Sequence, residues 1–293
     1  MKAFIIGASG LVGSHCLHLF KTAGWQVLGT HMNYPTDDTI YFDALSLNLS
    51  EYFDRLEFQP EIIVHCAALT NVDYCELNPE ESYKKTVEPT EKIAKYCIEK
   101  QIKLVYISTD YVFDGVNGPY VEGAPINPLN IYGAHKLKSE QLVSKVDDYI
   151  ITRITNVYGE EARSKNFVSR LLLNLENNEE KSLSLPYDQY ATPIYAGDIA
   201  RMIFELVKDN KKGIYHLSST DYFNRYQLAA KIKSYFKENR SVSIYPVKTS
   251  DSNQAALRPL YGGLLNIKFI SEYPKFVFTN VDSFILKNLN NGI

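Results

Sequence analysis

The sequence predicts an α/β fold in which a doubly wound parallel sheet is followed by a smaller α/β domain. Two observations predict it. Short apolar runs alternate with helical patterns through the first half of the chain, and such alternation gives a parallel sheet with helices on both faces. Several runs, such as KAFIIG (2–7) and EIIVHCA (61–67), are apolar without interruption, as strands buried on both faces are.

The elements of the first half follow in order from these patterns. The clearest helix start is at Asn78, with Pro79 in the first turn and acidic residues near the positive end of the helix dipole. Predicted strands span 2–7, 25–30, 39–42, 61–67, 103–108 and 149–154, and predicted helices span 11–23, about 49–57, 78–100 and 134–146.

After Gly159 the pattern changes. Helices are predicted at 164–178, 196–207 and 225–238, with a short strand after the first helix and another strand at 213–219. We therefore predict a first domain over 1–158, to which the chain returns at about 189–219, and a second domain over 159–293.

Composition limits the function classes. The chain has 293 residues, 45% of them hydrophobic and 22% charged, with a net charge of −3. No basic stripe predicts nucleic-acid binding, and no window is long and apolar enough to predict a membrane span. The four cysteines show no metal or disulfide spacing, which favours a cytoplasmic protein. His15 and His18 lie three residues apart without a third ligand, so no metal site is predicted.

A glycine-rich stretch, GASGLVG (7–13), joins the first strand to the first helix. Gly7 permits a tight turn, Gly10 lets the backbone approach a pyrophosphate at the helix N-terminus, and Gly13 lets the helix pack close to the sheet. In this position the spacing predicts a Rossmann-type dinucleotide site. The second strand ends at Thr30 and His31, which we count as cofactor-binding. No acid stands there to exclude a 2′-phosphate, so NADP(H) is favoured and NAD(H) stays open.

The stretch YGAHK (132–136) places Tyr132 and Lys136 one helical turn apart. Taken alone, this spacing is also that of an ordinary helix start. An ammonium near a phenol stabilises the phenolate and lowers the phenol pKa, which makes it a better acid–base catalyst near neutrality. The stretch STDYVFDG (108–115) precedes it at the end of a predicted strand.

These motifs together resemble the extended short-chain dehydrogenase/reductases, and within them the dTDP-4-dehydrorhamnose reductase branch. The resemblance extends through GPYVEGAPINPLNIYGAHKLKSE (118–140) and covers most of residues 1–200; shorter matches are CAALTNVDYCE (66–76), NVYG (156–159), NFV (166–168) and DQYATP (188–193). Three positions depart from the family's usual pattern: His135 replaces a small hydroxyl residue, Asn156 replaces a tryptophan that typically contacts the sugar, and Gly262 replaces a serine. The last two leave the identity of the sugar open.

The resemblance implies a set of site residues. It implies Thr109, Tyr132 and Lys136 as catalytic residues, with Tyr132 and Lys136 also touching the cofactor. It places Thr109, Asp110 and Arg258 at the substrate, although a surface salt bridge explains Arg258 equally well. The remaining cofactor residues it implies are Gly7, Gly10, Leu11, Val12, Asp43, Ala44, Cys66, Ala67 and Ala68.

The predicted function is that of an NAD(P)H-dependent reductase of a nucleotide-activated 4-keto-6-deoxy sugar, with Tyr132 as proton donor to the ketone oxygen. Tyr111 follows Thr109 and Asp110 where dehydratases of this superfamily carry a glutamate, which favours simple reduction. Two alternatives stay open. One is an NADP-binding regulatory subunit resembling the β subunit of methionine adenosyltransferase. The other is an epimerase or dehydratase that recycles its cofactor. A homodimer is also left open.

Overall fold

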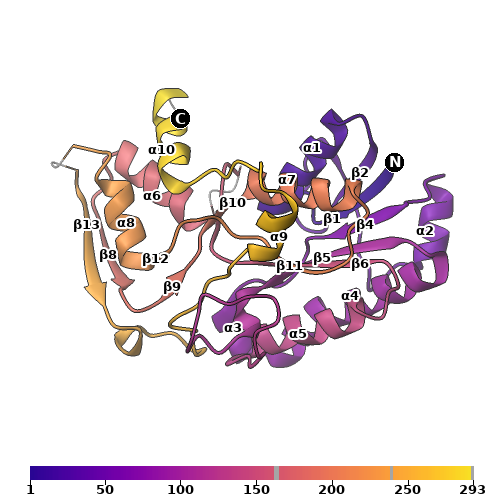
Figure 1. Cartoon of the computed structure of the whole chain (residues 1–293), viewed down its shortest axis with the longest axis horizontal. Coiled ribbons are helices and arrows are strands. Elements are labelled where there is room, and N and C mark those ends of the chain that lie inside the picture. Colours follow the sequence, from indigo (N-terminus) through magenta and orange to yellow (C-terminus); the bar gives the residue numbers. More distant parts are fainter. Residues whose placement is uncertain (162–164, 238–239, 292–293) are drawn as a thin grey trace.

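A computed structural model describes residues 1–161, 165–237 and 240–291. Its centre is a seven-stranded sheet in the order β11-β6-β5-β4-β1-β2-β3, and every neighbouring pair in it is parallel (Figure 1). The strands are β1 (Lys2–Ile6), β2 (Gln26–His31), β3 (Thr39–Tyr41), β4 (Ile62–His65), β5 (Lys103–Thr109), β6 (Tyr149–Ile154) and β11 (Gly213–His216). The predicted doubly wound, Rossmann-type sheet is confirmed.

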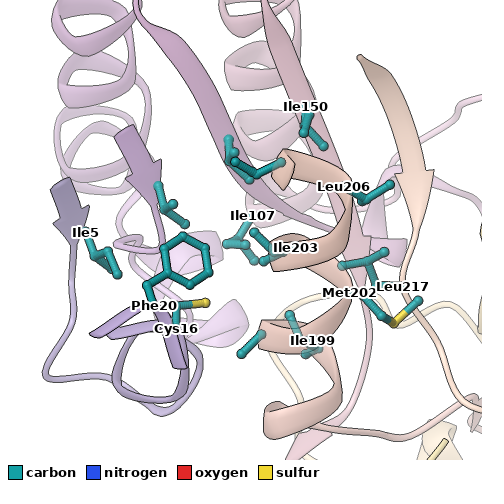
Figure 2. Packing of buried hydrophobic residues seen from close by; sticks show 14 of the residues in the cluster. Ile5, Cys16, Phe20, Ile107, Ile150, Ile199, Met202, Ile203, Leu206 and Leu217 are labelled. Carbon is teal, nitrogen blue, oxygen red and sulfur yellow. The ribbon is translucent and has the colours of Figure 1, made fainter. Parts of the chain in front are cut away.

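Helices cover both faces of this sheet (Figure 1). On one face α1 (Leu11–Thr22), α7 (Ala196–Lys208) and α9 (Ile267–Glu272) enclose an apolar core that includes Phe20 and Ile203 (Figure 2). On the other face α2 (Leu49–Arg55), α4 (Pro79–Lys100) and α5 (Ile131–Val143) bury a second core. The sheet is thus buried on both sides, which explains its uninterrupted apolar strands.

The predicted elements of the first half agree with the structure apart from their ends. The largest difference is α5, which begins at Ile131 rather than 134 because the Asn130 side chain accepts a hydrogen bond from the Gly133 N–H (2.8 Å) and so caps the helix three residues earlier. Sequence analysis also missed the short helix α3 (Val72–Leu77), which is capped by Asn71.

The second part of the chain forms a smaller lobe beside the carboxyl end of the sheet (Figure 1). Its core joins α6 (Phe167–Glu176), α8 (Arg225–Lys233) and α10 (Val281–Asn291) to the parallel pair β8 (Lys181–Pro186) and β13 (Val242–Val247). Short pairs join β7 (Val157–Tyr158) to β10 (Ile194–Tyr195) and β9 (Tyr190–Ala191) to β12 (Phe223–Asn224). Residues 164 and 238, where two predicted helices begin and end, lie outside the described residues. The domain boundary at 158 stays a prediction.

The chain passes more than once between the central sheet and the smaller lobe. After the smaller lobe begins, α7 and β11 return to the central sheet, and β11 pairs with β6 at its edge. Over the described ranges, none of the helices combines the length and apolar character needed to cross a bilayer.

Candidate active site

The glycine-rich loop forms a tight connection between β1 and α1. Gly7 has a φ of +79°, and a side chain at Gly13 would place its Cβ 2.3 Å from the Gly7 carbonyl oxygen. Gly10 is the N-cap of α1, and in the described structure no side chain caps this helix. The loop is therefore a cradle that side chains would fill, and first-turn amides at a helix N-terminus suit a pyrophosphate. The residues present fit a dinucleotide.

The residues predicted at the end of β2 have separate roles in the structure. Thr30 is buried, and its hydroxyl accepts a hydrogen bond from the Gly7 N–H (3.2 Å) and lies 3.3 Å from the Ile5 carbonyl oxygen. Thr30 thereby connects the glycine-rich loop to the neighbouring strand. His31 is half-buried, and its Nδ1 lies 2.9 Å from the Thr39 hydroxyl oxygen at the neighbouring strand.

The predicted adenine-side and strand-end residues lie at the same carboxyl edge of the sheet. Asp43 accepts a hydrogen bond from the Leu45 N–H (2.9 Å), and Ala44 beside it is buried. Cys66, Ala67 and Ala68 follow β4 directly. Ala67 adjoins the glycine loop, because a Cβ built at Gly7 would lie 3.1 Å from the Ala67 amide nitrogen.

The three predicted catalytic residues come from β5 and α5. Thr109 ends β5 and is buried, while Tyr132 and Lys136 lie one turn apart on α5. A hydrogen bond joins the side chains of Tyr132 and Thr109. Lys136 is 3% exposed as a residue, and its ammonium donates to the Ile107 carbonyl oxygen (2.5 Å) and lies 4.1 Å from the centroid of the Tyr106 ring. The structure therefore brings all three to the end of one strand.

The electrostatics of this pair differ from the sequence-based expectation. Burial raises the pKa of Tyr132 above its ordinary value, and the hydrogen bond with Thr109 opposes that rise only in part. Burial lowers the pKa of Lys136 to about 7, against the opposing effects of Glu140 and Cys66. The phenol is thus protonated across neutral pH, and the charge of the lysine changes near neutrality.

Asp110 lies in the interior between the two parts of the chain. It is 4% exposed, and its Oδ2 accepts a hydrogen bond from the Gly263 N–H (3.2 Å). Burial raises its pKa to about 6, although hydrogen bonds from Thr155 and Gly263 lower it. In this structure the carboxyl holds the 262–263 segment against the end of β5, where Thr109 lies.

A cavity of about 520 Å³ opens beside this centre. Tyr111 lines it, and the Tyr111 ring packs edge-on against the Tyr132 ring with centroids 5.6 Å apart. Four cationic residues of the described chain line the cavity, and no carboxylate of the described chain does: the cations are Lys165, Arg170, Arg225 and Arg258. Such a lining favours an anionic ligand.

Arg258 fits both interpretations made from the sequence. Its guanidinium pairs with Asp73 (2.8 Å) and donates to the Ala256 carbonyl oxygen (2.9 Å), yet its side chain is mostly buried and lines the cavity. Arg225 and Arg170 were missed by sequence analysis. Arg225 lies 4.7 Å from the centroid of the Phe167 ring. Each is a single arginine on a helix of the smaller lobe, and only its position in the lobe indicates a site.

A seven-stranded parallel sheet with a glycine cradle after β1, and a Tyr–Lys pair on the helix above β5, is the architecture of the extended short-chain dehydrogenase/reductases. The comparisons with known proteins are more specific. The chain belongs to the RmlD substrate binding domain family, whose model matches residues 1–277. The resemblance stated from the motifs is thereby confirmed.

Individual relatives extend this result. A solved dTDP-4-dehydrorhamnose reductase from Bacillus anthracis, in complex with NADP, is similar with a TM-score of 0.83 and 29% identity over 99% of both chains. Methionine adenosyltransferase 2 subunit beta of Xenopus tropicalis is 30% identical over 241 residues, covering 80% of this chain and 72% of that protein. A protein of Haloferax volcanii named "Probable low-salt glycan biosynthesis reductase Agl14" is 32% identical over 226 residues, covering 75% of each.

Proposed function

We propose that the protein is an NAD(P)H-dependent reductase that converts the ketone of a nucleotide-activated 4-keto-6-deoxy sugar to a secondary alcohol. The observation that carries the proposal is the meeting of Thr109, Tyr132 and Lys136 at the end of β5, beside a cavity lined by cations. The similarity to a dTDP-4-dehydrorhamnose reductase supports the substrate class.

The residues of the chain have defined roles in this reaction. Gly7, Gly10, Leu11 and Val12 would hold the pyrophosphate of the cofactor, whose reduced nicotinamide would supply a hydride when bound. The Thr109 hydroxyl orients the substrate carbonyl oxygen. Tyr132 donates its proton to that oxygen as the carbon becomes tetrahedral, so that C=O becomes CH–OH.

The pKa values suit the reductive direction. A proton donor must be protonated before the reaction, and the raised pKa of Tyr132 keeps its phenol protonated at neutral pH. The charged form of Lys136 would stabilise the phenolate that remains after proton transfer, and its ammonium would be available to hold the nicotinamide ribose.

The cationic cavity supports a nucleotide diphosphate as the part of the substrate remote from the ketone. Arginine is suited to phosphate because its planar guanidinium donates two parallel hydrogen bonds. Arg225 and Arg258 lie in the same lining as Tyr111, whose ring contacts the proposed proton donor. A diphosphate there leaves the sugar between the cavity and Tyr132.

We further propose a preference for NADP(H), a cytoplasmic location and a homodimer. β2 ends without an acid at Gly29, Thr30 and His31, so no carboxylate at the strand end repels a 2′-phosphate. The ratio of kcat/KM for NADPH and NADH tests the preference, and a strong preference for NADH would contradict it. Light scattering coupled to size-exclusion chromatography tests the homodimer.

The direct test is the loss of NADPH absorbance with a panel of nucleotide-linked 4-keto-6-deoxy sugars that vary in nucleotide and configuration. We expect turnover with at least one member, and turnover lower by roughly 10²–10⁴ in Tyr132→Phe at matched enzyme concentration. If NADPH binds but no member is reduced, the proposal is wrong.

A second candidate is a regulatory NADP-binding subunit. The observation that favours it is the 30% identity to methionine adenosyltransferase 2 subunit beta. This candidate predicts that the chain changes the kinetics of a methionine adenosyltransferase catalytic subunit and does not consume NADPH. Net NADPH oxidation that requires Tyr132 would exclude it as the sole function.

A further inference from the structure

Consecutive residues at the end of β5 contact one face of α5. The Ile107 carbonyl oxygen accepts a hydrogen bond from the Lys136 ammonium, and the Ser108 hydroxyl donates to Glu140 Oε1 (2.5 Å). Glu140 follows Lys136 by four residues on α5, as Lys136 follows Tyr132, so the three side chains share one face of the helix. Glu140 has no role in the proposed reaction.

Glu140 is a buried carboxylate in a built ion pair. It is 4% exposed, and its partner Arg153 on β6 is fully buried. The pair is bidentate, because Arg153 Nε donates to Oε1 (3.0 Å) and Nη2 donates to Oε2 (2.7 Å). A buried pair of this kind contributes little net stability compared with apolar residues, so its presence here calls for another explanation.

We propose that Glu140 is a positioning residue for Lys136: its buried carboxylate keeps the neighbouring ammonium charged and holds α5 where Lys136 reaches the end of β5. The catalytic use of Lys136 in this inference rests on the proposed function. The effect of Glu140 on the charge of Lys136 does not. Burial alone acts to neutralise the ammonium, and Glu140 is the first of the groups that oppose this effect, Cys66 being the other.

The other groups facing Lys136 do not replace that charge. His65 on β4 is neutral, because burial and the nearby Lys136 lower its pKa to about 3. Tyr106 on β5 is neutral as well, since burial raises the pKa of its phenol. Tyr132 is protonated for the same reason. Arg153, the remaining charged neighbour of Glu140, is a cation and is paired to it.

The experiment is a pH titration of the cofactor-free protein labelled with ¹³C at the lysine Cε carbons, in which Lys136→Met identifies the resonance of Lys136. In Glu140→Gln we expect the midpoint of Lys136 to fall by about one pH unit or more, which is a tenfold change in its protonation constant. Glu140→Asp should restore most of the shift. Glu99→Gln, which removes an exposed carboxylate from α4, should leave the midpoint unchanged.

A second readout is the pH dependence of NADPH affinity, measured by fluorescence. If charged Lys136 contacts the cofactor, affinity should decline at a lower pH in Glu140→Gln than in the wild type. Should Glu140→Gln fail to fold, Arg153→Met is titrated instead: it removes the cation that offsets the Glu140 carboxylate, so the midpoint of Lys136 should rise.

A Lys136 midpoint that stays within about 0.3 pH units of the wild type in Glu140→Gln, or in Arg153→Met if only that folds, would overturn the inference. Failure of the proposed function would give a different result from failure of this inference. A chain that reduces no nucleotide sugar but still shows the shift in its lysine titration retains the inference and loses the reductase activity.

Discussion

Replacing Asp110 by asparagine is expected to stabilise the protein relative to wild type as the pH rises. An exposed aspartate titrates near 3.9, whereas burial raises the pKa of Asp110 to about 6. Below pH ~4 the carboxyl is protonated in both folded and unfolded chains. Above pH 6 it is ionised in both, and the folded state then carries the cost of a buried charge. The folded wild type therefore loses stability between these pH values.

The magnitude follows from the separation of the two pKa values. A difference of about two pH units, at 1.36 kcal/mol each, gives a cost of about 3 kcal/mol at pH 8. At pH 5 only about half of that cost is present. Asparagine does not ionise, and its carbonyl oxygen can still accept the hydrogen bond that Gly263 donates. The stability difference between variant and wild type should thus be ~1–2 kcal/mol larger at pH 8 than at pH 5.

Urea unfolding of both proteins at pH 5 and pH 8 measures this difference, and the other titrating groups cancel in the comparison. Asp114→Asn is the matched control. A hydrogen bond from the Tyr120 hydroxyl (2.6 Å) lowers the pKa of Asp114, so its stabilising effect is lost only as the pH falls below about 4 and is constant between pH 5 and 8. If the difference for Asp110→Asn were equal at the two pH values, the reasoning would be refuted.

Three further predictions concern activity and cofactor binding. Tyr132→Phe should lower kcat by roughly 10²–10⁴ with NADPH affinity retained, because it removes only the donated proton; steady-state kinetics at wild-type rate would contradict this. Gly13→Val should weaken NADPH binding at least about tenfold by calorimetry, since even its Cβ would lie 2.3 Å from the Gly7 carbonyl oxygen, and unchanged affinity would show that the loop is not the cradle. Arg225→Gln should raise the KM for the nucleotide sugar by roughly tenfold or more, as loss of a charge-assisted hydrogen bond does, while leaving NADPH affinity unchanged; an effect on NADPH alone would place the cofactor, not the substrate, at Arg225.

The strands of the sheet could be predicted because each one has a signal within its own short stretch of sequence. Strands such as Lys2–Ile6 are buried on both faces, and a short apolar run bounded by polar residues is a sufficient signal for them. The start of α5 was harder to predict. The N-terminus of α5 depends on one hydrogen bond, which the Gly133 N–H donates to the Asn130 side chain. The spacing of apolar residues does not indicate where such a cap lies. The same shift places Tyr132 in the first turn of the helix, next to Thr109.

The cationic cavity was not predictable in the same way. Arg170 lies on α6 and Arg225 on α8, and each is the single arginine of its helix, which sequence reasoning assigns to a solvated surface. Both arginines line the same cavity because of the way α6 and α8 pack in the smaller lobe. Nor did the sequence show that burial would raise the pKa of Tyr132, because the effect comes from the surrounding structure rather than from the i,i+4 spacing.

Two of the departures from the family pattern, Gly262 and Asn156, lie close to the proposed active site. A Cβ at Gly262 would lie 3.1 Å from Asp110 Oδ2, closer than side chains usually pack, so a serine there would require the 262–263 segment to shift. Asn156 has a φ of +42°, which asparagine tolerates better than most residues, and its Oδ1 lies 3.4 Å from the nearest guanidinium nitrogen of Arg225. A tryptophan at this position would replace that polar contact with a large ring in the cavity. The departure at Asn156 therefore changes the lining of the cavity, and that at Gly262 changes the packing against Asp110. Both leave Thr109, Tyr132 and Lys136 in place, so a difference in sugar specificity is more consistent with them than a change of reaction.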